Sequence, residues 1–305
     1  MKSWLTALSA FALIGLPSVA LAWCRTTTCA ASDTSAEECQ PGLVVEGCQK
    51  AGNPLFWPKP CVSFSVQRDG SPSSKITADQ LEEVVRTSFD NWQNAECNAG
   101  QHPNISVERY PQVECKEARY NQKERNQNVW LFRDDAWPHV GDGDRTIALT
   151  LVSFHPKTGE IYDVDVELNS FQRKFTLNPV SVESQGDDLY SVAQHESGHF
   201  LGLAHSSDGE STMWSNYNGS ADMQTLERDD ADGICAAYPP TGVVDAACDA
   251  EPRHGFSTKC AEPQDSCSLV AGRVRPGPLV PWLFLATLGL MTVRSSNRLR
   301  RQLRR

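Results

Sequence analysis

The stretch from residue 195 to residue 205 constrains this chain more than any other feature. It reads His-Glu-Ser-Gly-His-Phe-Leu-Gly-Leu-Ala-His and holds three of the seven histidines. On a helix, His195 and His199 lie one turn apart and point the same way, so both imidazoles can bind one Zn²⁺. Gly202 can adopt a positive φ, which would end the helix and return His205 to the same ion. Three nitrogen ligands leave a fourth position open, as in catalytic zinc sites.

Glu196 follows the first predicted ligand and would lie beside the metal without binding it. From there it can accept a proton from a zinc-bound water molecule and act as general base. The alternative is that these are ordinary helix histidines, solvated or hydrogen-bonded. The glycine and the third histidine make a chance match far rarer than for H-E-x-x-H alone. The sequence therefore predicts one catalytic zinc, held by His195, His199 and His205.

The same run is the metzincin signature, and Ser206 after the last histidine resembles the matrixin branch, the matrix-metalloprotease-like peptidases. Ser211-Thr212-Met213 lies where that family has its Met-turn, and the resemblance makes Met213 an apolar floor beneath the metal. Leu226 to Pro239 resembles the closing helix. The resemblance covers residues 55–240. It implies an α+β zincin/metzincin fold: a twisted, mostly parallel sheet with an antiparallel edge strand, an active-site helix and a C-terminal helix.

The resemblance implies a zinc metalloendopeptidase that hydrolyses peptide bonds in extracellular proteins. The substrate would pair as an added strand with residues 147–154, and Gly202 and Met213 would support the site. The candidate pocket residues beside the helix are Gln194, Trp214, Asn216 and Tyr217. Two alternatives stay open: a non-catalytic surface binding or adhesion module on the same fold, and a structural metal site. A structural site would need a fourth protein ligand and would give Glu196 no purpose.

The sequence departs from the animal matrixins in two respects. It contains no PRCGxPD-type cysteine switch, and no histidine and aspartate set matches a second, structural zinc, so we expect His139 and His155 at the surface. Acidic residues either bind Ca²⁺ through their oxygens or are simply solvated. These residues are Asp142, Asp144, Asp163, Asp165 and Glu167.

Hydrophobic periodicity predicts strands that come mostly before the helices, which is typical of an α+β domain. The expected strands cover residues 61–66, 105–110, 128–132, 147–154 and 161–168. Thr77 is the predicted N-cap of a helix over residues 78–94, the active-site helix begins at residue 187 or 188, and the last helix covers residues 225–238.

Both ends of the chain resemble targeting signals. Residues 1–22 have a basic start, an apolar run and an Ala-Leu-Ala site, the pattern of a secretory signal peptide. Residues 279–293 are apolar and are followed by an arginine-rich end. This order, with Cys267 ahead of it, resembles the myxobacterial-type C-terminal sorting signal and implies processing near Cys267. A plain membrane anchor is the alternative, although the apolar stretch is shorter than the ~20 residues that span a bilayer comfortably.

Composition completes the expected organisation. Eleven cysteines without a C-x-x-C pair indicate disulfides in an oxidising compartment, with Cys267 as the candidate without an internal partner. The net charge of −10, with arginines gathered in the tail, argues against nucleic acid as a partner. We expect a monomer that is secreted or anchored at the cell surface, acts on proteins or peptides, and contacts membrane only through its C-terminal segment before processing. The expected divisions are a signal peptide (1–22), a Cys-bearing segment (23–60), the catalytic domain (61–240), a disulfide-bearing linker (241–277) and the hydrophobic, arginine-rich tail (278–305).

Overall fold

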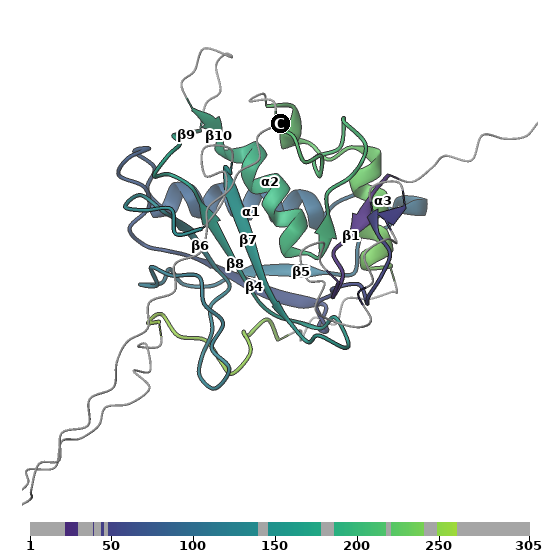
Figure 1. Cartoon of the computed structure of the whole chain (residues 1–305), viewed down its shortest axis with the longest axis horizontal. Helices are drawn as coiled ribbons and strands as arrows, with labels where there is room; N and C mark the ends of the chain where they lie inside the picture. Colours follow the sequence, from purple (N-terminus) through teal and green to yellow (C-terminus); the bar gives the residue numbers. More distant parts are fainter. Residues whose placement is uncertain are drawn as a thin grey trace, which may run out of the picture. The chain divides into compact units, whose positions relative to one another are not determined.

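The computed structural model describes eight stretches of the chain (Figure 1). They are residues 22–29, 39, 44–45, 48–139, 146–177, 186–217, 221–240 and 249–260. The expected signal peptide up to residue 21, Asp142, Asp144, Cys267 and the C-terminal apolar segment lie outside the described residues. Among the helices that are described, none is long and apolar enough to cross a membrane.

A five-stranded sheet forms the centre of the domain, with strand order β5-β4-β6-β8-β7. The strands are β4 (Cys61–Val66), β5 (Ser106–Arg109), β6 (Val129–Phe132), β7 (Ala148–Phe154) and β8 (Ile161–Leu168). Neighbours pair in parallel except β7, which runs antiparallel to β8 at one edge. The expected mostly parallel sheet with an antiparallel edge strand is confirmed.

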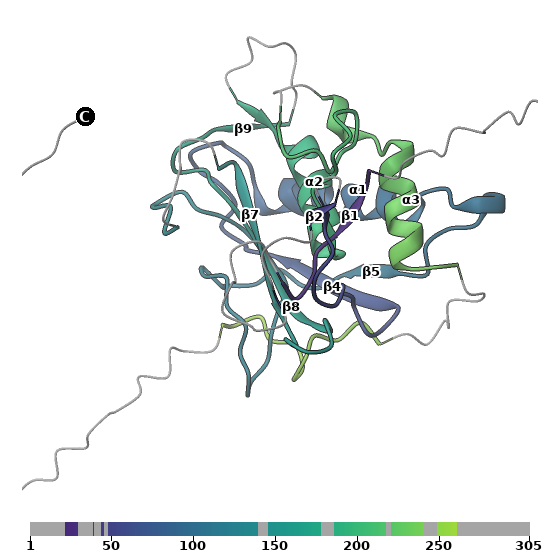
Figure 2. The same cartoon turned by 45° about the vertical axis from the view of Figure 1, so that its right-hand side comes forward.

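Two helices, α1 (Ala78–Gln93) and α2 (Leu189–Phe200), lie on the same side of the sheet (Figures 1 and 2). In α1 the predicted cap is present, because the Thr77 hydroxyl accepts the N–H of Gln80 and the Gln80 side chain accepts the N–H of Thr77. One face of α1 is buried in the main core, as its period predicts. That face consists of Leu81, Val84, Val85, Phe89 and Trp92.

The closing helix α3 (Arg228–Ala237) begins three residues later than predicted. A reciprocal cap between Glu227 and Asp230 explains this start, since the Asp230 carboxylate accepts the N–H of Glu227 at 2.9 Å. A 3₁₀ turn, Asp222–Gln224, comes before it, and another covers Asn98–Gly100.

The remaining strands are two residues long. They are β1 (Cys24–Arg25), β2 (Val44–Val45), β3 (Cys48–Gln49), β9 (Phe175–Thr176), β10 (Asp187–Asp188) and β11 (Leu203–Ala204). The pair that matters for the site is β1 with β11, which are antiparallel neighbours. Figure 2 shows β1 beside α2 and α3. The N-terminal segment therefore packs against the strand that follows the active-site helix.

Disulfide bonds tie the outer segments to the domain, and the predicted use of cysteine is confirmed. The described bonds are Cys24–Cys48, Cys29–Cys39, Cys97–Cys235 and Cys115–Cys260, and Cys61 is also disulfide-bonded. The two cysteines of one bond, Cys115 and Cys260, are 145 residues apart in the sequence. Such long closed loops restrict the unfolded chain strongly, which stabilises the folded domain.

Residues 249–260, which we assigned to a linker, pack against the second face of the sheet. The hydroxyl of Ser63 donates to the carbonyl of Ala250 at 2.7 Å, and Gln127 donates to the carbonyl of Ser257 at 2.9 Å. Phe256 and Cys260 contact a small second core. Its buried members are Val113, Cys115, Val129 and Leu131. An extended covering segment has no periodic pattern, so the sequence did not predict this contact.

The acidic face of β8 is buried and not solvated. Asp163 is 2 % exposed, Asp165 4 % and Glu167 1 %. Glu167 forms an ion pair with Arg133 and a hydrogen bond with the half-buried His139. Burial raises the pKa of Asp165 to about 6 and raises that of Asp163 well above its usual value. The expectation of solvated acids is therefore wrong, because β8 is an inner strand covered on both faces.

Candidate metal centre and active site

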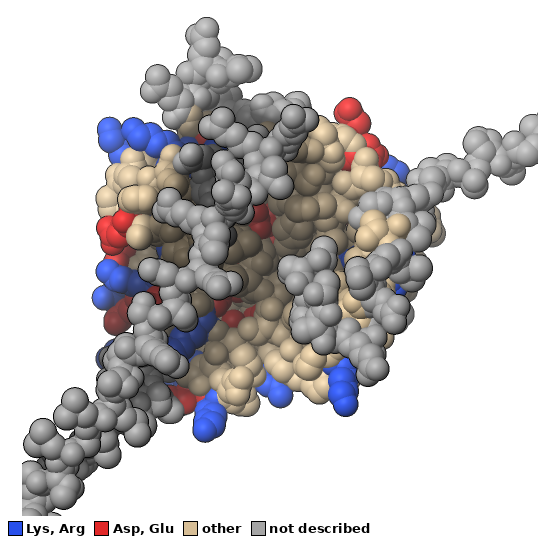
Figure 3. Space-filling model, viewed as in Figure 1, with Lys and Arg blue, Asp and Glu red and all other residues tan. Residues whose placement is uncertain are grey.

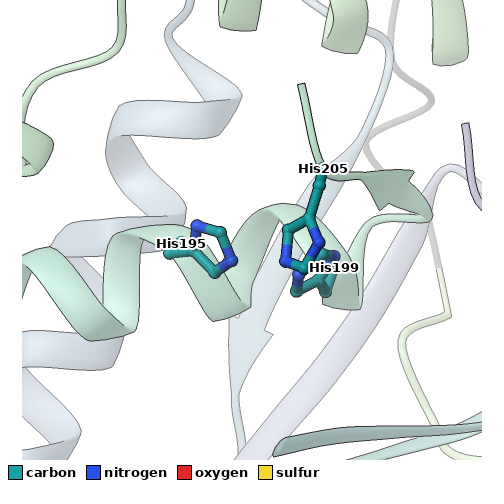
Figure 4. A group of neighbouring side chains, drawn as sticks. All are labelled: His195, His199 and His205. Carbon is teal, nitrogen blue, oxygen red and sulfur yellow. The ribbon is translucent and has the colours of Figure 1, made fainter. Parts of the chain in front are cut away.

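Helix α2 and the turn after it bring three histidines together. The helix begins at Asp188, whose side chain accepts the N–H of Ser191 at 3.0 Å. Figure 4 shows the imidazoles of His195, His199 and His205 facing one another. Their ring centroids lie 4.7 to 5.2 Å apart, and their candidate ligand atoms all lie within 4.8 Å of one another.

The donor set fits a zinc ion. The Nδ1 atom of His195 is hydrogen-bonded to the carbonyl of Thr212 at 2.7 Å, and that of His199 to the carbonyl of Leu203 at 2.9 Å. These bonds orient the rings and leave Nε2 for a metal. Burial lowers the pKa of each of the three histidines to about 4, so they are neutral at pH 7, as metal ligands must be. Within the described stretches, no other group of three or more His, Cys, Asp or Glu could hold a metal.

Gly202 makes the turn that was predicted for it. Its φ is +87°, and an added Cβ would lie 2.7 Å from the carbonyl oxygen of Leu55. The N–H of Thr26 donates to the Gly202 carbonyl at 3.0 Å, and Arg25 donates to the same oxygen at 3.4 Å. The hydroxyl of Thr26 donates to Leu203, the carbonyl that also holds His199. The N-terminal segment thus supports the turn, a role that no sequence signal indicated.

Met213 packs beneath α2. It is buried, and a Cβ built on Gly198 would come 2.3 Å from its sulfur atom. The backbone of this turn is held by Asp230 of α3, whose carboxylate accepts the N–H of Thr212 at 2.8 Å and that of Met213 at 3.1 Å. Burial raises the pKa of Asp230. Asp230 lies within the predicted closing helix, but no sequence pattern indicated this contact.

Asp229 connects the N-terminal segment to the chain next to His205. One carboxylate oxygen accepts the N–H groups of Ala22 and Trp23 at 3.0 and 2.9 Å. The other accepts the hydroxyl of Ser206 at 2.7 Å, directly after His205. Both acidic residues at the start of α3 therefore brace the loops around the metal centre.

Glu196 is buried beside the histidines and lines a cleft together with His195 and His205. Its Oε2 atom accepts the hydroxyl of Thr150 on β7. Burial raises the pKa of Glu196. Because a carboxylate next to a metal position can accept and return a proton, its placement suits a general base.

The cleft has a volume of about 650 Å³ and runs between β7 and the chain after Met213. Trp214, Asn216 and Tyr217 line it, as expected, and so does Arg173, which was not predicted. Arg173 makes an ion pair with Asp187, with nitrogen–oxygen distances of 2.5 and 2.6 Å.

Gln194 does not line this cleft. Its side chain is 1 % exposed and accepts a hydrogen bond from Asn91 of α1 at 2.8 Å. One residue before His195, it points about 100° away around the helix, toward α1. The expectation of a pocket role for Gln194 is therefore corrected to one in helix packing.

On the face shown in Figure 3, Lys and Arg side chains of the described residues lie scattered near the edges, with Asp and Glu among them. They form no continuous basic patch on that described surface.

The mixed sheet, the active-site helix and the three-histidine centre with an adjacent glutamate are those of the metzincin class of metallopeptidases. The family model described as Matrixin matches residues 56–239, more than half of the chain. The chain belongs to the matrixin family, a family of zinc-dependent metalloendopeptidases.

Several curated proteins are similar to parts of the chain. Matrix metalloproteinase-25 of Homo sapiens is 34 % identical over 110 residues, which cover 35 % of this chain and 18 % of that protein. Interstitial collagenase of Bos taurus is 53 % identical over 57 residues, or 19 % and 12 % of the two chains. Matrix metalloproteinase-16 of Homo sapiens is 26 % identical over 190 residues, or 60 % and 27 %. The chain thus spans well under two thirds of the length of these relatives.

Proposed function

We propose that this chain is an exported zinc-dependent endopeptidase that hydrolyses peptide bonds in extracellular proteins. The observation that carries the proposal is that His195, His205 and Glu196 line one cleft, with His199 completing the ligand set. Zn²⁺ bound by these histidines would act as a Lewis acid, polarising the scissile carbonyl and lowering the pKa of a water molecule.

Glu196 would take the proton of the attacking water and then deliver it to the leaving amine nitrogen. Its position beside the histidines, in the cleft that His195 and His205 also line, supports this role. Met213 and Gly202 would act through the histidines: the first packs beneath the helix, and the second turns the chain toward His205.

The substrate would lie extended along β7, which is an edge strand of the five-stranded sheet. Main-chain hydrogen bonds from an edge strand hold a peptide without regard to its sequence, and side-chain pockets give the preference. Trp214 and Tyr217 are the proposed pocket residues. Main-chain pairing also supports proteins, rather than small molecules, as substrates.

Export is supported by the disulfide bonds, which persist in oxidising compartments. We propose that residues 1–22 are the signal peptide and that the protein acts as a monomer, secreted or at the cell surface. Membrane contact would involve only the C-terminal apolar segment before processing near Cys267.

The test is cleavage of a mixed-peptide library by the chain, produced in an oxidising compartment, beside Glu196→Gln and the control Glu210→Gln. Glu210 is exposed and does not line the cleft. We expect cleavage by the parent and the control, loss of cleavage in Glu196→Gln, and equal zinc content in all three. A folded, zinc-loaded parent that cleaves nothing would favour the non-catalytic binding module.

A further inference from the structure

A polar side chain interrupts the apolar face that β7 turns toward α2. Ala148 and Val152 of this strand both pack against the main core. Residues two apart on a strand share a face, so Thr150 lies between them on that face. Its cross-strand partner on β8 is Val166, which is fully buried and has no hydrogen-bonding side chain. Thr150 is half-buried, so its hydroxyl can face either solvent or a protein partner.

The hydroxyl has a protein partner, Glu196. The Thr150 hydroxyl donates to Oε2 of Glu196 across the space between β7 and α2. Among the described residues, this is the only hydrogen bond made to that carboxyl group, which is 7 % exposed. One carboxylate oxygen is thereby held by the edge strand, and Oε1 is left for a reactant in the cleft that Glu196 lines.

We propose that Thr150 is a positioning residue that holds the Glu196 carboxylate in place for proton transfer. The inference rests on the proposed peptidase function. A glutamate side chain has three rotatable bonds, and one fixed oxygen removes most of this freedom before the reaction. Because β7 would also pair with the substrate, one strand would set the positions of both the base and the scissile bond. The rate of proton transfer depends on the distance between the base and the reacting atoms, since a displacement of about 1 Å can cost roughly 100-fold in rate.

Three variants of the whole chain separate positioning from packing. Thr150→Val removes the hydroxyl and keeps the β-branched shape that suits a strand. Thr150→Ser keeps the hydroxyl. The matched control is Thr87→Val on the exposed side of α1, where the hydroxyl donates to the carbonyl of Glu83 at 2.8 Å. For each, kcat and KM on one peptide and bound zinc are measured.

We expect kcat of Thr150→Val to fall roughly 10- to 100-fold, with KM and zinc content as in the parent. Thr150→Ser should recover most of the loss, and Thr87→Val should match the parent. The proposal is overturned if Thr150→Val keeps the parent's kcat, if serine and valine are equally impaired, or if the loss lies in zinc content or KM.

A second measurement does not depend on activity. Thr150→Val, Glu196→Ala and the double variant are unfolded in urea without metal. The contact predicts non-additive effects, with a coupling of roughly tenfold in the unfolding equilibrium constant. Additive effects would show that the contact is absent in solution and overturn the proposal. If the coupling is found but the zinc-loaded parent cleaves no peptide, the contact exists and the peptidase function is refuted. The positioning role is then refuted with it.

Discussion

Gly198 sits where α2 packs most closely over the Met-turn, and its replacement by alanine tests that packing. An added Cβ would lie 2.3 Å from the sulfur of Met213 and 2.8 Å from Cζ2 of Trp92. Trp92 is fully buried, and its indole N–H donates to the carbonyl of Gln194 at 2.9 Å, so it has little room to move. The methyl group can be admitted only if Met213 shifts.

Two opposing effects set the size of the change. Alanine favours a helix over glycine by roughly 0.5–1 kcal/mol. Overpacking a core costs about 1–3 kcal/mol. Because both close contacts involve buried atoms, we expect the second effect to exceed the first and Gly198→Ala to lower the free energy of unfolding by about 1–2 kcal/mol. Since Met213 lies under the helix that carries two ligands, zinc affinity should fall as well.

The assay is urea unfolding of the metal-free protein with its disulfides intact. Gly209→Ala is the control, because a Cβ there comes no closer than 3.9 Å to any neighbour, an atom of Trp214. Met213→Ala removes the side chain that the new methyl group would meet. It should therefore lower the free energy of unfolding less in the Gly198→Ala background than in the parent. If Gly198→Ala instead stabilises the protein by the helix-propensity amount, the close packing of Met213 against α2 is refuted.

Two further changes test the buried carboxylates. Burial raises the pKa of Asp163, so the folded chain binds this proton more tightly than the unfolded chain and loses stability as the pH rises above about 4. Asp163→Asn should therefore match the parent near pH 4 and exceed its free energy of unfolding at pH 8, and identical pH profiles in urea would contradict this. Asp230→Ala leaves the N–H groups of Thr212 and Met213 without their acceptor. The substitution should lower the free energy of unfolding by about 2–3 kcal/mol and weaken zinc retention against a chelator. Unchanged retention would show that Asp230 of α3 does not support the metal centre.

Local patterns were sufficient for the secondary structure that carries the site. The predicted strand over residues 61–66 and that over residues 161–168 match the structure, and the first helix begins at Ala78, directly after its predicted cap. The closing helix was placed correctly but started too early, because its reciprocal Glu227–Asp230 cap was not recognised. These features depend on neighbours within a few positions, which the sequence displays directly.

Contacts between distant segments were not predictable in the same way. Asp163, Asp165 and Glu167 alternate along β8 and so share a face. That this face is buried depends on distant partners, such as Val129 beside Asp165 and Arg133 beside Glu167. Thr26 and Asp230 lie far apart in the sequence, and both hold turns next to the histidines. No local sequence pattern predicts either contact.

The sequence by itself determined that three histidines come together, because helical spacing places His195 and His199 on one face and a glycine at residue 202 allows the return of His205. It also determined the helix and strand periods and the disulfide-rich character. Only the tertiary structure decided what holds this set in place: Thr150 on Glu196, Asp230 on the Met-turn and the N-terminal segment on the Gly202 turn. The physical reason is that periodicity encodes which side of an element a residue faces, whereas its partner depends on which other element packs there.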